Sequence, residues 1–308
     1  MERKPLVSIV MPVYNAMPYL EQAVQSIYAQ TVTDWELIVI DDCSTDGSWD
    51  YLQKVDDTRI YFIRNERRKR QHDSVNHGKK IARGKYIARM DADDLMLPKR
   101  IEKQIELIES NTELDVVGCG FFRVKDNMNI LTVRRPPSNH QEITCLLLGP
   151  LSWIHGPNFY ITDGTLLGHS KWFKRWDYDV HIPHAMDFDL MCRSERYSVF
   201  GNVIEPLYVY RVGSGSSNSY NSQIIAVYHK AISLCKYGLY KGSMLKSIFG
   251  LIALIPRPLS YAVVKTFFHG SINKRGLIFI KVAFEDIKFL KEGLDEIAKV
   301  EVPLKKCT

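Results

Sequence analysis

Asp91 and Asp93, two carboxylates one residue apart, directly follow a strand-like stretch of the sequence. Where a chain leaves a sheet, side chains at this spacing can both face one pocket. Hard cations such as Mg²⁺ and Mn²⁺ prefer oxygen ligands and often complete their coordination with substrate phosphates. The pair therefore indicates a site for a metal and a phosphorylated ligand, although an isolated Asp-x-Asp is more often an acidic turn that caps the next helix.

Two other polar groups also follow strand-like stretches. Tyr14 comes after the first, and Asp41-Asp42, followed by a Ser-Thr-Asp-Gly sequence, comes after the second. Tyr14 could stack on a nucleobase, and Asp42 could accept hydrogen bonds from a base edge or a ribose hydroxyl. The alternatives are a half-buried aromatic side chain and a helix-capping turn, because Asp, Ser and Gly favour turns.

Strand-like and helix-like patterns alternate over the first 125 residues. This alternation predicts an α/β fold, with a mostly parallel sheet flanked by helices. We expect strands over Leu6–Val13, Leu37–Ile40, Arg59–Ile63, Lys85–Met90 and Leu114–Val124, and helices over Tyr19–Gln30, opening after Pro18, and from Pro98 to about Ser110. Ligands of such sheets bind outside the carboxyl ends of the strands, which is where all three polar groups fall.

The composition is that of an ordinary globular protein, with 308 residues, 45% hydrophobic and 25% charged. Its six cysteines are scattered and form no Cys-x-x-Cys pair, so we expect neither a disulfide framework nor a zinc site, and a cytoplasmic setting. The apolar run Leu6–Val13 is short and lacks a cleavage site, which favours a strand over a signal peptide.

The net charge of +6 is unevenly spread, since residues 206–284 contain ten Lys and Arg but no Asp or Glu. Two apolar runs in this stretch, Leu245–Pro256 and Leu259–Phe268, are each too short to span a bilayer. We expect them to lie on the anionic inner face of the cell membrane. A helical subdomain packed on the rest of the chain and a homodimer interface are the alternatives. No nucleic-acid-binding motif is present, so nucleic acid is not an expected partner.

Three stretches, in this order, resemble the family 2 glycosyltransferases: Ser8–Asn15 (SIVMPVYN), Trp35–Ser48 (WELIVIDDCSTDGS), and Gly84–Asp94 (GKYIARMDADD) with Pro98–Gln104. The resemblance is strong over roughly the first 125 residues and weaker to about residue 215. It implies a GT-A-type catalytic domain over 1–215, with a nucleotide-sugar half at 1–125 and an acceptor half at 126–215. A basic and apolar helical segment over 216–308 follows a turn-rich boundary at Gly213–Asn218.

The resemblance also implies roles for single residues. Pro12, Tyr14 and Asp42 fall where the family contacts the nucleoside of the donor. Asp91 falls near the ribose and the metal, and Asp93 where the family ligates the Mg²⁺ or Mn²⁺ that bridges the two phosphates. The implied reaction is one in-line displacement that inverts the anomeric centre.

That displacement needs a base, and the family places an Asp at the start of a helix in a Glu-Asp pair. Asp187 occupies this position, with Met186 in place of the usual Glu. Asp189 is the second candidate, or a structural cap of the helix.

Two stretches depart from the family pattern. The usual Ala-Arg-Asn-x-Gly loop after the third strand is replaced by a basic run over residues 64–72, which either reaches phosphates or an anionic acceptor, or is a solvated loop. The late Tyr-Arg-x-His of the family appears as Tyr210-Arg211 without the His. Arg211 is therefore expected to be the remaining diphosphate contact.

Together these features predict an inverting, metal-dependent hexosyltransferase. Its expected donor is a nucleotide-diphospho-sugar, first of all a UDP-sugar, and its acceptor a saccharide or lipid-linked saccharide in cell-surface polysaccharide synthesis. A catalytically silent nucleotide-sugar-binding protein is one alternative, prompted by Met186 and the missing His. A sugar nucleotidyltransferase is another, although no Gly-rich triphosphate loop lies near the N-terminus.

Overall fold

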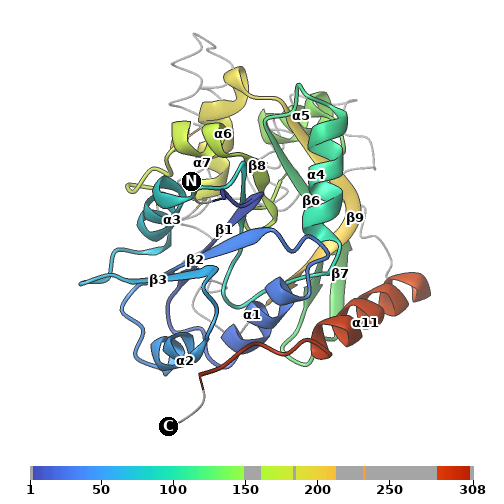
Figure 1. Cartoon of the computed structure of the whole chain (residues 1–308). Helices are drawn as coiled ribbons and strands as arrows, with labels where there is room; N and C mark the ends of the chain where they lie inside the picture. The colour runs from blue at the N-terminus through green and yellow to red at the C-terminus, as the bar shows by residue number, and fades with distance from the viewer. Residues whose placement is uncertain (1–2, 149–160, 183–184, 213–231, 234–282, 306–308) are drawn as a thin grey trace, which may run out of the picture.

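The computed structural model of the chain describes residues 3–148, 161–182, 185–212, 232–233 and 283–305 (Figure 1). They form one nine-stranded sheet covered by helices on both faces. Strand residues alternate between the two cores, so that Ile9 and Met11 face one and Val10 faces the other. The predicted α/β class and the predicted flanking helices are therefore confirmed.

The N-terminal part of the sheet consists of four parallel strands in the order β3-β2-β1-β4. These strands are β1 (Val7–Val13), β2 (Trp35–Asp41), β3 (Ile60–Arg64) and β4 (Tyr86–Arg89). Every residue of β1 and β2 is buried, as expected for central parallel strands with helices on both faces. The predicted strands agree with the observed ones to within a few residues.

Beyond β4 the sheet is mixed, so a parallel arrangement describes only the first half. The remaining strands are β5 (Leu95–Met96), β6 (Val116–Val124), β7 (Ile130–Arg134), β8 (Leu167–His169) and β9 (Phe200–Arg211). Strand β8 is antiparallel to both β4 and β6, and β6 is parallel to β9. Short β8 therefore joins the two halves into one sheet.

Helices α1 (Leu20–Tyr28), α2 (Ser48–Lys54) and α4 (Arg100–Ser110) contribute to the core on one face of the sheet. The other face carries α3 (Gln71–Ile81), α5 (His140–Leu148), α6 (Ser170–Arg175) and α7 (Met186–Ser194). Two 3₁₀ helices, η1 (Asp163–Thr165) and η2 (Glu195–Tyr197), complete the loops. A Cβ on Gly78 of α3 would lie 2.6 Å from Cγ1 of Val10, so this glycine permits the close approach of α3 to β1.

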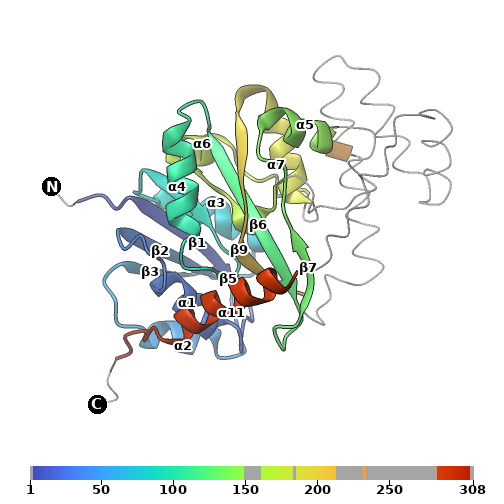
Figure 2. The same cartoon turned by 90° about the vertical axis from the view of Figure 1, so that its right-hand side faces the viewer.

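Helix α11 (Phe284–Ala298), from the predicted C-terminal segment, packs against the described body of the protein (Figure 2). Its buried Leu290 and Ile297 join a core with Phe122 and Val133 of the β6–β7 hairpin. No helix among the described residues is long and apolar enough to cross a membrane. The predicted boundary at 213–218 and the apolar runs at 245–256 and 259–268 lie outside the described residues.

After α11, residues 300–305 contact the N-terminal part of the structure at α1 and α2. The side-chain amide of Gln25 donates to the carbonyl of Val300 at 2.6 Å, and the amide of Lys305 donates to the carbonyl of Lys54 at 2.7 Å. Leu304 also forms a β-bridge with Val55. Residues near the end of the sequence therefore pack on α1 and α2 of the first domain half.

Candidate active site

The Asp91-Ala92-Asp93-Asp94 turn connects β4 to the short strand β5. Arg211 on β9 fixes this turn with two hydrogen bonds. The backbone amide of Arg211 donates to Oδ1 of Asp94 at 2.8 Å, and Nη1 of the Arg211 side chain donates to the carbonyl of Asp93 at 2.6 Å. Tyr208, also on β9, accepts the amide of Asp91 at 3.2 Å. The antiparallel pairing of β5 with β9 thus holds the motif at a defined place on the sheet edge.

The side chain of Asp91 is oriented by two donors. Nη2 of Arg89 lies 2.8 Å and Nε2 of Gln71 lies 2.7 Å from Oδ1 of Asp91. Gly164 approaches from η1, and a Cβ there would be 3.0 Å from Oδ2 of Asp91 and 2.7 Å from the hydroxyl of Tyr208. Asp91 is therefore held in a single direction by its surroundings.

Three carboxylates crowd together in this turn. Asp93 reaches solvent, although protein atoms surround much of its side chain. This partial burial is the main cause, and the charge of Asp91 the second, that raises the pKa of Asp93 to about 6. Asp94 is buried, and the same two causes, burial first and then the charges of Asp93 and Asp91, raise its pKa well above the usual range. The turn therefore has a negative electrostatic potential, and a bound cation would stabilise its carboxylates.

The described part of the chain contains no group of three or more His, Cys, Asp or Glu side chains arranged to hold a metal ion. Mg²⁺ and Mn²⁺ sites that are completed by phosphates need only one or two protein carboxylates. No Lys or Arg of the described residues forms an ion pair with Asp93, so its oxygens face no competing partner of that kind. Asp93, with Asp91 beside it, fits such an ion.

The predicted nucleoside contacts lie at the ends of the neighbouring strands. Pro12 is buried within β1, and Tyr14 follows that strand with its side chain exposed. Asp42 follows β2 and is buried. Residues 68–71 connect these positions, because they contact Tyr14, Asp42 and Asp91. The structure therefore brings the predicted donor residues to one edge of the sheet.

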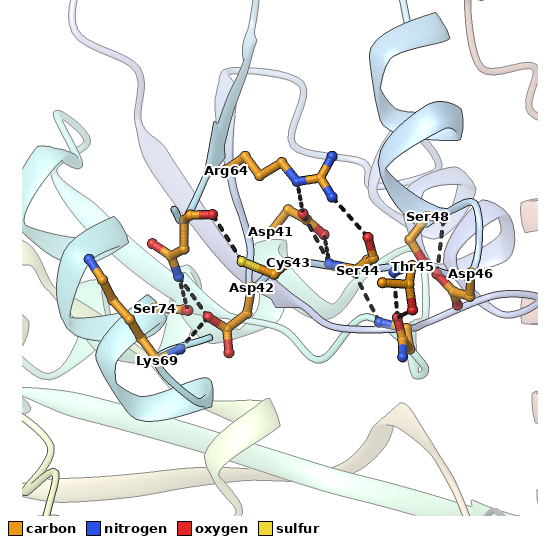
Figure 3. Close-up of polar contacts among 12 residues, drawn as sticks. Asp41, Asp42, Cys43, Ser44, Thr45, Asp46, Ser48, Arg64, Lys69 and Ser74 are labelled. Atoms are coloured by element: carbon orange, nitrogen blue, oxygen red, sulfur yellow. Dashed lines mark hydrogen bonds and ion pairs between the residues drawn. The ribbon is translucent and has the colours of Figure 1, made fainter. Parts of the chain in front are cut away.

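Asp42 already accepts three hydrogen bonds, of which Figure 3 shows the one from Lys69. Its Oδ1 accepts hydrogen bonds from Nδ2 of Asn65 at 2.8 Å and from the amide of Lys69 at 2.7 Å, while Oδ2 accepts from the amide of Arg70 at 2.8 Å. The basic run after β3 is thus neither a free solvated loop nor solely a source of positive side chains, because its backbone organises this carboxylate.

The Ser44–Gly47 stretch forms the turn that was the alternative interpretation of the sequence (Figure 3). Oγ of Ser44 accepts the amide of Asn15 at 3.0 Å, and Oδ2 of Asp46 accepts the amide of Met17 at 2.9 Å. Gly47, at the N-cap of α2, has a φ of 90°. These contacts fix the loop after β1 to the loop after β2, and so position Tyr14 relative to Asp42.

Asp187 lies in the first turn of α7 and is partly exposed. Burial and the charge of Asp163 raise the pKa of Tyr178 above its ordinary range, and the charge of Asp187 adds a smaller contribution. The Tyr178 hydroxyl donates to Asp163, and Oδ2 of Asp163 lies 3.0 Å from Nη2 of Arg89, the partner of Asp91. A chain of polar contacts therefore connects Tyr178 to the Asp91 turn.

Asp189, the second candidate base, has a structural environment. It is buried, and its carboxylate accepts hydrogen bonds from Nε of Arg193 at 2.7 Å and from Oγ of Ser233 at 3.1 Å. Of the two aspartates, Asp187 is the more accessible to a substrate.

Arg211 is buried and supports the acidic turn. Besides the carbonyl of Asp93 it contacts the side chain of Gln22, and its guanidinium lies 5.0 Å from the ring centre of Tyr19. Its contact with a donor diphosphate stays a prediction.

Three residues of this network were not identified from the sequence: Arg89, Asp163 and Tyr178. Arg89 carried the only recognisable signal, since it is a charged residue that ends an otherwise apolar strand. The structure shows that it is fully buried. Asp163 and Tyr178 come from irregular segments far along the chain, and only the tertiary structure brings them to Arg89.

Comparison with known proteins places this site in a family. The model of the family described as "Glycosyl transferase family 2" matches residues 8–167. An uncharacterized glycosyltransferase of Methanocaldococcus jannaschii is 34% identical over 68% of this chain and 71% of its own length. A UDP-Glc:alpha-D-GlcNAc-diphosphoundecaprenol beta-1,3-glucosyltransferase of Escherichia coli is 39% identical over 40% of this chain and 53% of its own.

Solved structures confirm the GT-A type of fold. Residues 1–349 of TarS of S. aureus, in complex with UDP-GlcNAc, superpose with a TM-score of 0.59 at 16% identity, covering 89% of this chain and 77% of that fragment. The mannosyltransferase PcManGT of Pyrobaculum calidifontis, in complex with GDP-Man and Mn²⁺, gives 0.54 at 14% identity, covering 96% and 87%. With the family model matching more than half of its length, this chain belongs to glycosyltransferase family 2.

Proposed function

We propose that the chain transfers a hexose, with inversion, from a UDP-sugar to a lipid-linked saccharide during cell-surface polysaccharide synthesis. The observation that carries this proposal is the acidic turn after β4, in which Arg89 and Gln71 orient Asp91 and Asp93 reaches solvent. The fold also provides a partly exposed carboxylate, Asp187, in the first turn of α7. A displacement reaction needs both kinds of group.

The donor and acceptor classes are supported by relatives. The name of the Escherichia coli relative specifies UDP-Glc as donor and a diphosphoundecaprenol-linked sugar as acceptor. That match covers 53% of the relative's length, so a lipid-linked acceptor for this chain is part of the proposal. TarS contains UDP-GlcNAc, in agreement with a uridine donor.

Asp93, with Asp91, would hold a divalent cation, and a structural neighbour contains Mn²⁺. When bound, such an ion stabilises the negative charge on the departing diphosphate as a Lewis acid. The protein's own contribution is to fix Asp91 through Arg89 and Gln71 and the turn through Arg211.

In the proposed reaction Asp187 removes the proton from an acceptor hydroxyl. The oxygen then attacks the anomeric carbon from the face opposite the leaving group, while the bond between that carbon and the diphosphate oxygen breaks. The electron pair of the broken bond leaves with the nucleoside diphosphate. One displacement of this kind inverts the configuration, and the proton remains on Asp187 until it exchanges with solvent.

The activity test combines UDP-sugars, Mn²⁺ and a membrane lipid extract, with release of UDP and sugar transfer as readouts. We expect Asp187→Asn to lower turnover at least a hundredfold while UDP binding persists, because general-base catalysis contributes about 10²–10⁴-fold. Asp50→Asn, a change of the same type at an exposed position on α2, is the matched control.

Unchanged turnover in Asp187→Asn would reject Asp187 as the base. Absence of turnover in the unchanged protein, with UDP binding retained, would instead favour the silent binding protein. Pyrophosphate release from a nucleoside triphosphate and a sugar phosphate would favour the nucleotidyltransferase.

A further inference from the structure

Residues 68–71, which we call the basic strap, lie along the edge of the sheet that carries Tyr14, Asp42 and Asp91. Arg68 contacts Tyr14, the amides of Lys69 and Arg70 bind Asp42, and Gln71 binds Asp91. One short segment thus contacts three of the residues that the family resemblance assigns to the donor. Its conformation bears directly on how a nucleotide enters.

Arg68 covers the face of Tyr14. Its guanidinium carbon lies 3.9 Å from the ring centre, which is stacking distance for two planar groups. A nucleobase that stacks on the same face would need this place. Both side chains are exposed, so Arg68 can turn away into solvent without disturbing a packed core.

The backbone of the strap is fixed more firmly than the Arg68 side chain. The amides of Lys69 and Arg70 and the side chain of Asn65 donate to the carboxylate of Asp42, which is 3% exposed. Arg70 has a φ of 78°, a conformation that side-chain-bearing residues rarely adopt, so the charged acceptor compensates for a strained backbone.

We propose that Arg68 takes the place of the nucleobase on Tyr14 and that donor binding displaces only this side chain, while the strap backbone stays on Asp42. This inference rests on the proposed function. It makes Arg68 a residue that lowers donor affinity, and it makes Asp42 a positioning residue for the strap.

The test measures dissociation constants of UDP with Mn²⁺ and of uridine alone. Loss of an exposed cation–π contact is expected to tighten binding about two- to fivefold in Arg68→Ala, equally for uridine and UDP. Arg67→Ala removes the same charge from the adjacent exposed position and should give no gain.

Weaker UDP binding in Arg68→Ala, or the same change in Arg67→Ala, would overturn the competition, because Arg68 would then serve the phosphates or only the general charge. A gain for UDP without one for uridine would overturn it too.

Hydrogen exchange adds a readout that does not depend on affinity. The amides of Lys69 and Arg70 should stay protected when UDP binds, and loss of their protection would show that the whole strap leaves Asp42. If neither the unchanged protein nor Arg68→Ala binds any nucleoside diphosphate, the proposed function fails and the inference fails with it. Binding without a gain overturns the inference alone.

Discussion

Asp93 combines an ordinary residue type with an unusual environment. Partial burial and the nearby charge of Asp91 raise its pKa to about 6, whereas Arg89, two residues from Asp91, is paired on both sides by carboxylates. Arg89 thus forms an ion pair with Asp91, whereas Asp93 forms none among the described residues and feels the charges of Arg211 and Arg89 only as smaller effects on its pKa. Repulsion between carboxylates is expected to destabilise the folded protein at a cation site when the cation is absent.

We predict that Asp93→Asn stabilises the protein in the presence of a chelator at pH 7.5. Because the folded-state pKa of about 6 lies above the ordinary 3.8, the folded protein holds this proton more tightly, and stability falls as pH rises from 3.8 to 6. Asn removes that cost. Since solvent screens the side chain, we expect a gain of about 2 °C in melting temperature, vanishing near pH 4.

Addition of Mn²⁺ should reverse the order, because the unchanged protein gains stability by binding the ion and the variant does not. Asp50→Asn serves as the control and should follow the unchanged protein at every pH. A melting temperature of Asp93→Asn below that of the unchanged protein at pH 7.5 with chelator would contradict the assignment.

Among the described elements, α11 is the helix whose packing was least predictable from the sequence. Its buried face meets the β6–β7 hairpin through Leu290 and Ile297, and Arg135 of the following loop forms an ion pair with Asp286. This part of the predicted 216–308 segment is therefore a packed helix, in agreement with the alternative of a subdomain docked on the catalytic domain.

We predict that Leu290→Ala loosens α11. Leu290 is 3% exposed, and removal of a buried leucine side chain costs about 2–5 kcal/mol. The urea midpoint should fall, and protease cleavage within 284–298 should accelerate. Ile287→Ala, on the same helix at 51% exposure, should change stability by less than about 0.5 kcal/mol. Equal effects of the two substitutions would show that α11 does not dock through Leu290.

The sequence predicted the first half well because its signals are local. Strands β1, β2 and β4 are apolar runs that end in polar groups, and those endings placed Tyr14, Asp42 and Asp91 correctly at one edge. Helix α1 begins at Leu20, two residues after Pro18, because residues 16–19 form a turn in which Tyr19 and Leu20 both bond to the carbonyl of Ala16.

The mixed second half was not predictable in the same way. Strand β8 has three residues, and β5 has two, so neither shows a periodic pattern. Asp163 could not be connected to Arg89, since this contact depends on how distant segments fold together. In the first half, the bond from the Lys69 amide to Asp42 gave no signal either, because Lys69 lies in an irregular loop. Irregular segments therefore supply much of the site while giving little sequence signal.

The whole molecule has a charge distribution that concerns its surroundings. Residues 213–284 carry nine basic and no acidic side chains, and we propose that they attach the enzyme to the anionic inner face of the membrane, where a lipid-linked acceptor would lie. An electrostatic attachment of this type weakens with salt.

We predict that the protein cosediments with vesicles of anionic lipid at 0.1 M NaCl but much less at 0.5 M, and less still with neutral vesicles. Replacement of Lys246 and Lys265 by Gln should weaken binding roughly tenfold or more, since each basic residue near the surface contributes about 1 kcal/mol. Lys80→Gln/Lys99→Gln makes the same charge change at exposed positions of the first half and should have little effect. Equal losses would indicate that only net charge matters.

The contacts of residues 300–305 with α1 and α2 also impose an order on how the protein is made. The bond between Gln25 and Val300 joins positions 275 residues apart. At roughly 5–20 residues per second of translation, the first 125 residues wait about ten seconds or longer before residues 300–305 are synthesised. During that interval the surface of α1 and α2 that these residues cover stays exposed.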